Sequence, residues 1–197
     1  MAKKLATVYF LCLLSLFIIT HFGEAAQCTP ESDPKYLCTA RCNGTSFDLS
    51  KAFDFPMKIT EPTARGGTGN TYWYTWDPCH IVKCPGYPAG TDIAVCQSAN
   101  FFYNCGRNSK SIWLLSDRLQ PQENFPNWQV EYTFGIDWRI TIFNFTIDHT
   151  VEEPTVKFIS EDPELQYNFE VRGKCIGQES FDCKQYYESR NKLKDKN

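Results

Sequence analysis

Histidine is scarce in this sequence, and recognisable catalytic motifs are missing. Three histidines occur, and neither His80 nor His149 belongs to a nucleophile elbow, a His-Glu-x-x-His motif or a phosphate-binding loop. The adjacent acids Glu152 and Glu153 precede Pro154 in a stretch expected to be a loop, so they give no sign of the paired carboxylates of a glycosidase. We therefore expect the protein not to be an enzyme and to need no cofactor.

Runs of lysine and arginine are also missing, and the formal net charge is −3. A protein that binds nucleic acid through phosphates needs a basic patch, so this balance argues against nucleic acid as a partner. The pairs Cys38-x3-Cys42 and Cys79-x4-Cys84 have spacings that a zinc site uses, but no histidine stands in a zinc-finger pattern beside them. We expect no metal site.

There is one long apolar run, and it lies near the start of the chain. Two lysines precede this run from Leu5 to Ile19, and the small residues Ala25 and Ala26 follow it. A basic start, a short apolar centre and small residues at the end are typical of a cleavable signal peptide, here residues 1–26. The run is shorter than the roughly 20 residues that cross a bilayer. We expect a soluble protein in the secretory pathway, the endolysosomal lumen or outside the cell, with no membrane span.

Ten cysteines occur, and Cys12 lies within the predicted signal peptide. In an oxidising compartment the other nine are expected to form disulfides. The nine are Cys28, Cys38, Cys42, Cys79, Cys84, Cys96, Cys105, Cys175 and Cys183. Because nine is odd, one thiol must stay free or pair with another chain, and the second case would permit a covalent dimer.

Two Asn-x-Thr sequons stand at Asn43 and Asn144. Such sequons are acceptors for N-glycosylation in exported proteins, and they lie on the surface when they are used. Together with the predicted signal peptide they indicate a glycoprotein.

From Phe47 onward, short aromatic and β-branched runs alternate with turns rich in Gly, Pro, Asn and Asp. This pattern is typical of an all-β sandwich or flattened antiparallel barrel. The expected strands cover residues 71–76, 92–97, 111–115, 128–134, 138–147, 155–159 and 167–171. Residues 27–41 look polar and loop-like, and the polar tail 177–197 has a possible helix around 178–192.

Five motifs, in order, resemble the mannose 6-phosphate receptor homology family. The motifs are CNGTSFDLS (42–50), YTWDPCHIVKCPGYPAGTDIAVCQ (74–97), VEYTFG (130–135), WRITIFNF (138–145) and YNFEVRGKC (167–175). They are most similar in style to the extracytoplasmic repeats of the cation-independent receptor. The resemblance covers residues 42–176 and implies a disulfide-stabilised lectin domain of flattened β-barrel or sandwich type.

In that family a Gln, an Arg, a Glu and a Tyr hold mannose. The resemblance implies that Gln97, Arg139, Glu161 and Tyr167 hold the sugar here, with Glu164 as the alternative to Glu161. The chemistry suits a hexose, whose hydroxyls both donate and accept hydrogen bonds. An arginine offers a rigid fork of donors, a carboxylate accepts from adjacent hydroxyls, and an amide does both.

The sequence also departs from the family pattern. Three residues separate Gly135 from Arg139, where family members have a longer loop with a cysteine that helps to surround the phosphate. Two further family cysteines are replaced by Ile147 and Leu165. The resemblance still implies the disulfides Cys42–Cys79 and Cys84–Cys96. It leaves Cys175 to pair with one of Cys183, Cys105, Cys28 or Cys38.

Two functions remain open at this point. The first is a soluble lectin for mannose-terminated glycans or glycoproteins, phosphorylated or not. The second is a protein-interaction module that kept the fold and lost the sugar. The short loop before Arg139 weighs against a phosphate pocket of the receptor type.

Overall fold

The computed structural model describes residues 26–30, 38–42, 44–53, 55–61, 71–116, 127–176 and 181–194. The predicted signal peptide lies outside these residues except for Ala26, and so does the sequon residue Asn43. The strands are β1 (Ala26–Gln27), β2 (Thr29–Pro30), β3 (Thr39–Cys42), β4 (Thr45–Asp48), β5 (Met57–Thr60), β6 (Trp73–Trp76), β7 (Val95–Ser98), β8 (Phe102–Gly106), β9 (Ser111–Ser116), β10 (Asn127–Tyr132), β11 (Ile140–Ile147), β12 (Thr155–Glu161) and β13 (Gln166–Gly173). One α-helix, α2, covers Phe181–Lys194.

A six-stranded sheet forms the larger layer of the protein, with strand order β1-β9-β10-β11-β13-β12. Strands β10 and β11 form the expected hairpin, although the connection extends over residues 133–139 and contains a short 3-10 turn, η5 (Ile136–Trp138). Strands β11 and β13 run parallel, which is the one departure in this sheet from the antiparallel pairing that the sequence analysis expects. The parallel pairing arises because the chain leaves β11, crosses to the edge as β12, and returns between them as β13.

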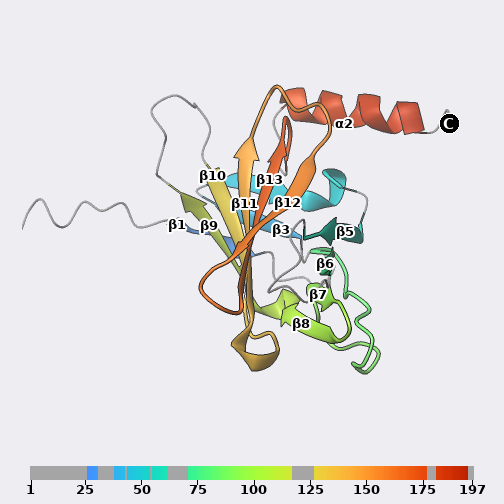
Figure 1. Cartoon of the computed structure of the whole chain (residues 1–197). Helices are drawn as coiled ribbons and strands as arrows, with labels where there is room; N and C mark the ends of the chain where they lie inside the picture. The colour runs from blue at the N-terminus through green and yellow to red at the C-terminus, as the bar shows by residue number, and fades with distance from the viewer. Residues whose placement is uncertain are drawn as a thin grey trace, which may run out of the picture.

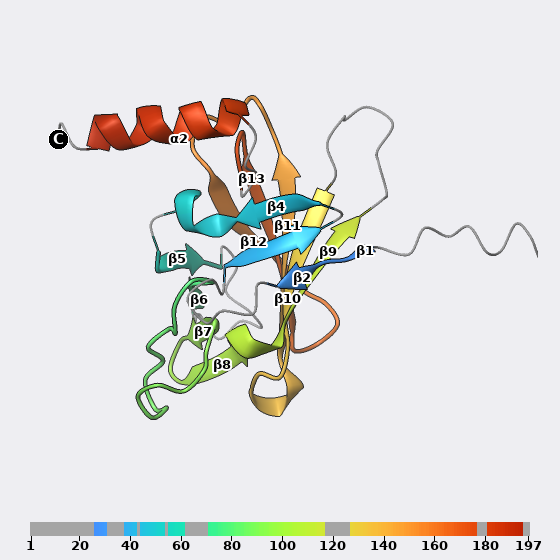
Figure 2. The ribbon, with the colours of Figure 1, turned by 180° about the vertical axis from the view of Figure 1, so that it is seen from behind.

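Two smaller sheets lie on one face of the large sheet. One has the order β2-β3-β4 and the other β5-β6-β7-β8. Figures 1 and 2 show β2–β4 stacked across the large sheet and β5–β8 beside its lower end. The described strands thus form an open, all-β sandwich held by disulfides, as the sequence pattern predicts, and no closed barrel is present among them.

Aromatic side chains fill the space between these layers. The Trp76 ring of β6 stacks on the Phe143 ring of β11 with 4.0 Å between centroids, and Trp128 stacks on Phe145 at 3.8 Å. Phe47 of β4 completes this contact against Trp128 at 4.8 Å. All five side chains are almost fully buried. These aromatic residues therefore belong to the hydrophobic core. Truncating one of them to alanine typically costs about 3–5 kcal/mol of stability.

Strand β11 shows why the local sequence folds this way. Its residues alternate between the core and the outer face, with Thr141, Phe143 and Phe145 turned inward. The hydroxyl of buried Thr141 donates a hydrogen bond of 2.8 Å to the carbonyl oxygen of Cys105. This bond ties β11 of the large sheet to β8 of a small one. The sequon residue Asn144 is exposed on the other face, as glycosylation requires, and its modification stays a prediction.

The N-terminal end of the described chain differs from the sequence interpretation, whereas the C-terminal end contains the helix that the interpretation named as possible. Parts of residues 27–41, which were expected to be loop-like, belong to short strands: β1 pairs with β9, and β2 pairs with β3. The polar C-terminal tail contains helix α2, which projects away from the sheets in both views (Figures 1 and 2). No helix in the described ranges has the length and apolar character that crossing a membrane demands.

Four disulfides join the described cysteines: Cys28–Cys42, Cys38–Cys79, Cys84–Cys96 and Cys175–Cys183. Cys84–Cys96 is the pairing that the family resemblance implies. The predicted pair Cys42–Cys79 is wrong: Cys42 ends β3, whereas Cys38 directly precedes that short strand. Cys38 lies beside Cys79, and Cys42 lies beside Cys28.

The odd cysteine is Cys105 in β8, and its thiol is free and fully buried. Burial raises the pKa of this thiol from 9.0 to about 12, despite the nearby charge of Arg139. A thiol in this position is not presented to a second chain in the folded protein. The structure therefore gives no support to the covalent dimer that the odd count permitted.

Candidate functional site

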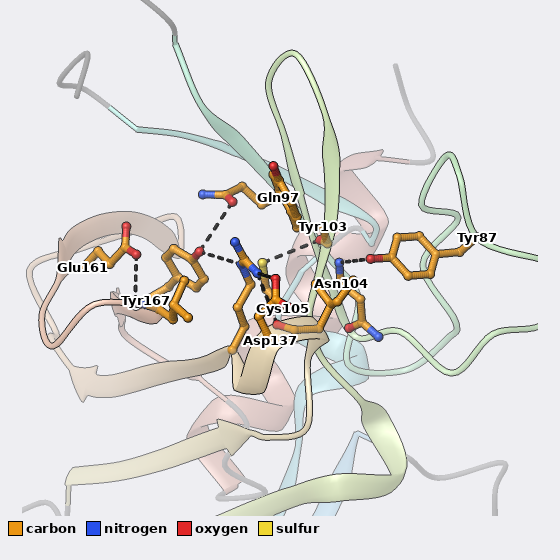
Figure 3. Close-up of polar contacts among 11 residues, drawn as sticks. Tyr87, Gln97, Tyr103, Asn104, Cys105, Asp137, Glu161 and Tyr167 are labelled. Carbon is orange, nitrogen blue, oxygen red and sulfur yellow. Dashed lines mark hydrogen bonds and ion pairs between the residues drawn. The ribbon is translucent and has the colours of Figure 1, made fainter. Parts of the chain in front are cut away.

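Three of the four predicted sugar-binding residues are joined by hydrogen bonds in the structure. Nε of Arg139 donates to the Tyr167 hydroxyl at 3.0 Å, and that hydroxyl lies 3.5 Å from Oε1 of Gln97, to which it donates. The residues come from three different segments: Gln97 from β7, Arg139 from the end of the η5 turn, and Tyr167 from β13. Figure 3 shows Gln97 and Tyr167 facing each other across this contact.

The same chain of hydrogen bonds continues into the core. Nε2 of Gln97 donates to the Tyr74 hydroxyl at 2.9 Å, and that hydroxyl donates to Oε2 of Glu61 at 3.1 Å. Each hydroxyl accepts one hydrogen bond and donates the next, so the bonds run in one direction from the guanidinium of Arg139 to the carboxylate of Glu61. Glu61 is only 3% exposed. A buried carboxylate needs such donors, because burying an unpaired charge is costly.

The strands place these side chains through their pairing. Tyr74 of β6 is the direct partner of Gln97 of β7, and Tyr167 of β13 is the direct partner of Thr141 of β11. The rings of Tyr74 and Tyr167 lie 5.5 Å apart. Gln97 is 4% exposed and Tyr167 is 1% exposed, so both polar groups are held in fixed positions within the core.

Arg139 has contacts on several sides. Its Nη1 donates to Oδ2 of Asp137 at 2.9 Å and to the carbonyl oxygen of Ile136 at 3.2 Å. The guanidinium carbon lies 4.3 Å from the ring centroid of Tyr103, which is a cation–π contact. Burial lowers the pKa of Arg139, but Tyr167 and Asp137 outweigh it and the net pKa is raised. Arg139 is therefore charged at every physiological pH.

The turn that carries Arg139 is tight and strained. Asp137 and Trp138 have φ angles of 54° and 62°, in the left-handed region that non-glycine residues seldom adopt. Gly135 is required at the start of the turn, since a Cβ there would lie 2.6 Å from the carbonyl oxygen of Asn104. The turn also exposes aromatic surface, with Trp138 at 77%. The turn η5 lies beside β8 (Figure 1), the strand that contains Asn104.

Glu161, the fourth predicted residue, ends β12 and is the direct strand partner of Tyr167. Its Oε1 accepts a hydrogen bond of 2.8 Å from the backbone N–H of Leu165, in the loop between β12 and β13. Figure 3 places this carboxylate on the side of Tyr167 away from Asp137. Glu161 is thus next to the site, with one oxygen directed at its own loop. The binding roles of all four residues stay predictions.

Four residues of this arrangement were not predicted as site residues: Glu61, Tyr74, Tyr103 and Asp137. Tyr74 carried a signal, because in the strand WYTW it shares a face with Trp76 and both are buried. Asp137 lies two positions before the predicted arginine, a spacing that could have indicated an ion pair. Glu61 and Tyr103 come from segments that the motifs did not cover, and their proximity depends on the tertiary fold.

Other groups of ionisable residues do not form a comparable site. His80 pairs with Asp77 through Nδ1 at 3.2 Å, and the same carboxylate accepts from the backbone N–H groups of Cys79 and His80. This arrangement closes a turn. Within the ranges that the structure describes, no cluster of three or more His, Cys, Asp or Glu side chains is placed to hold a metal ion.

The chain is similar to a solved structure but matches no protein-family model. No protein-family model matches the chain, and no curated protein matches its sequence. Among solved structures, it is similar to domain 11 of the echidna mannose 6-phosphate/insulin-like growth factor 2 receptor, determined by NMR in solution. The sequence identity is 15%, the alignment covers 79% of this chain and 95% of that domain, and the TM-score is 0.46. The receptor is of the kind that the sequence motifs resemble.

Proposed function

We propose that this protein is a lectin-like glycoprotein that binds mannose-terminated glycans through Gln97, Arg139 and Tyr167. The observation that supports this is the chain of hydrogen bonds from Arg139 through Tyr167 to Gln97. These residue types were expected from motifs far apart in the sequence, and the fold brings them within hydrogen-bonding distance. Three unrelated polar residues would not be expected to form such a chain of hydrogen bonds by chance.

The available polar groups suit a hexose. A sugar hydroxyl both donates and accepts, and the site combines a guanidinium donor, an amide that does both and a phenolic hydroxyl. Their burial fixes their directions before a ligand arrives, which reduces the free energy needed to order them. An epimer with one hydroxyl misplaced would leave a buried group unpaired, at a cost of roughly 1–3 kcal/mol. Discrimination of mannose from galactose is thus within reach of the site.

The proposed location is the secretory pathway, the endolysosomal lumen or the extracellular space. The four disulfides support it, because disulfides persist in oxidising compartments. The exposed sequon residue Asn144 is consistent with the same location. A glycan or glycoprotein is the partner that this location would offer.

A second function has a specific observation in its favour. Nη1 of Arg139 is already bonded to Asp137 and Ile136, and Oε1 of Glu161 is bonded to Leu165. Polar groups that already form hydrogen bonds with one another do not need a sugar as a hydrogen-bond partner. In that case the fold would serve as a protein-interaction module, and the exposed side chain of Trp138 would be a natural contact for a partner.

Binding to a glycan array tests these alternatives. The mature glycoprotein is compared with the Gln97→Ala and Arg139→Ala variants, each shown to be folded by circular dichroism. The lectin proposal predicts selective binding to mannose-terminated glycans that is lost in both variants. If the folded wild-type protein binds no glycan on the array, the lectin proposal fails and the interaction module replaces it.

A further inference from the structure

The charge of Arg139 is balanced by a residue of its own turn. Oδ2 of Asp137 lies 2.9 Å from Nη1 of Arg139, and the arginine side chain is only 11% exposed. The aspartate side chain is 65% exposed, so water and salt screen the pair in part, although less than a pair with both ends exposed. The turn holds the pair in place through the hydrogen bond from the Arg139 N–H to the Ile136 carbonyl. Arg139 thus enters the site as half of an ion pair.

The hydrogen bonds of Arg139 also restrict what a ligand can contact. Nε is engaged by Tyr167, and Nη1 by Asp137 and the Ile136 carbonyl. Among the contacts of the described residues, Nη2 has no hydrogen-bond partner. Recognition of a phosphate by arginine is strongest when two parallel N–H groups meet two oxygens. Nε is already used on one edge and Nη1 on the other, so neither edge can form that fork without breaking an existing bond.

Further carboxylates stand around the same hydrogen-bonded chain. Glu61 ends it in the core, and Glu161 pairs in register with Tyr167. A cation also contacts the turn, because Nζ of Lys110 lies 5.7 Å from the ring centroid of Phe134. The Lys110 side chain is exposed, so solvent screens its charge. Among the described residues, the charged side chain paired directly with Arg139 is thus the Asp137 carboxylate.

From these contacts we infer that Asp137 makes the site selective for uncharged hexoses and against sugar phosphomonoesters. The inference rests on the proposed function and deepens it by naming the class of sugar. A phosphomonoester carries roughly −1.5 to −2 charges near neutral pH, and it would meet the Asp137 carboxylate beside the guanidinium of Arg139. A neutral hexose needs single hydrogen bonds, which Nη2 can donate without disturbing the ion pair.

Calorimetric titration tests the inference with two matched sugars. Methyl α-D-mannopyranoside and its 6-phosphate are titrated into the mature glycoprotein and into the Asp137→Asn variant. Asparagine keeps the size and the acceptor oxygen, and removes the charge. We expect the wild-type protein to bind the neutral sugar at least about tenfold more tightly than the phosphate at low salt. In Asp137→Asn this preference should fall by at least about fivefold, mainly through tighter binding of the phosphate.

Asp148→Asn serves as the matched control. It removes the same charge just beyond the far end of β11, where Asp148 pairs with Arg172, and it should leave the preference unchanged. Equal or tighter binding of the phosphate by the wild-type protein overturns the inference while the lectin proposal stands. An unchanged preference in Asp137→Asn, or an equal change in Asp148→Asn, overturns the role of Asp137. Binding of neither sugar overturns the lectin proposal, and this inference with it.

Discussion

The hydroxyl of Tyr167 accepts a hydrogen bond from Nε of Arg139 across 3.0 Å, although the two residues are 28 positions apart in the sequence. The parallel pairing of β11 and β13 makes this possible. It sets the start of β13 beside the start of β11, directly after the turn that carries Arg139. The contact therefore depends on a strand direction that the strand patterns did not predict.

The Tyr167→Phe variant should lose both sugar binding and stability. It leaves Nε of Arg139 and Oε1 of Gln97 without the hydroxyl between them, and unpaired buried groups cost roughly 1–3 kcal/mol. Urea denaturation would measure the loss of unfolding free energy, and calorimetry the loss of mannoside binding. Tyr103→Phe is the control, since it keeps the ring that lies over the guanidinium. Equal behaviour of the two variants would show that the Tyr167 hydroxyl has no special role.

Replacing Gly135 by alanine should damage the site through the backbone. The new Cβ would lie 2.6 Å from the Asn104 carbonyl oxygen and 2.9 Å from that of Arg139, so the turn must shift. We expect a loss of roughly 1–3 kcal/mol in stability and a clear loss of affinity for mannosides.

Gly86→Ala provides the comparison for that variant. Gly86 has φ of +86° with open space around it, so alanine costs roughly 1–2 kcal/mol of strain without touching the turn at Arg139. Its mannoside affinity should match that of the wild-type protein. A Gly135→Ala variant with unchanged affinity would mean that the turn does not position Arg139 for binding.

The buried thiol predicts a loss of stability in alkaline solution. Burial raises the pKa of Cys105 from 9.0 to about 12, so the unfolded chain releases this proton at a lower pH than the folded one. The stabilisation is therefore complete below pH 9 and declines as the pH rises from 9 toward 12. Melting temperatures between pH 8 and 10 should fall more steeply for the wild-type protein than for Cys105→Ala. Parallel curves for the two proteins would contradict the buried position of the thiol.

Disulfide removal should follow the length of the loop that each bond closes. Cys38–Cys79 spans 41 residues and Cys175–Cys183 spans 8. The entropy of loop closure then predicts that replacing the first pair by serine costs about 1.5 kcal/mol more than replacing the second. Denaturation of the two double-serine variants measures this difference. A larger cost for Cys175–Cys183 would show that helix α2 contributes more to the fold than its one disulfide-bound end indicates.

Strand positions and core faces could be predicted from the sequence because they depend on local alternation. The order of residues in β11 fixes which of them face inward, whatever strand lies beside it. The direction of the neighbouring strand is not encoded in that alternation. The parallel direction of β13 was therefore missed, although a strand at residues 167–171 was correctly expected.

The site could be predicted only as far as the motifs reached. Gln97, Arg139 and Tyr167 stood in recognisable segments, and the structure brings them together. The pairing of Asp137 with Arg139 depends on left-handed backbone angles in η5, which no residue-level preference specifies. The disulfide of Cys42 was mispredicted for a similar reason. Its partner Cys28 lies between β1 and β2, in a segment that the sequence indicated to be a loop.

Nuclear magnetic resonance titration with methyl α-D-mannopyranoside tests the central claim most directly. The side-chain amide of Gln97 and the Nε–H of Arg139 give separate signals, and the side-chain amide of buried Asn108 serves as a control elsewhere in the fold. Binding at the proposed site predicts saturable shifts of the Gln97 and Arg139 signals with little change at Asn108, and a weaker response to the galactoside. Unchanged Gln97 and Arg139 signals at saturating sugar would contradict the lectin account.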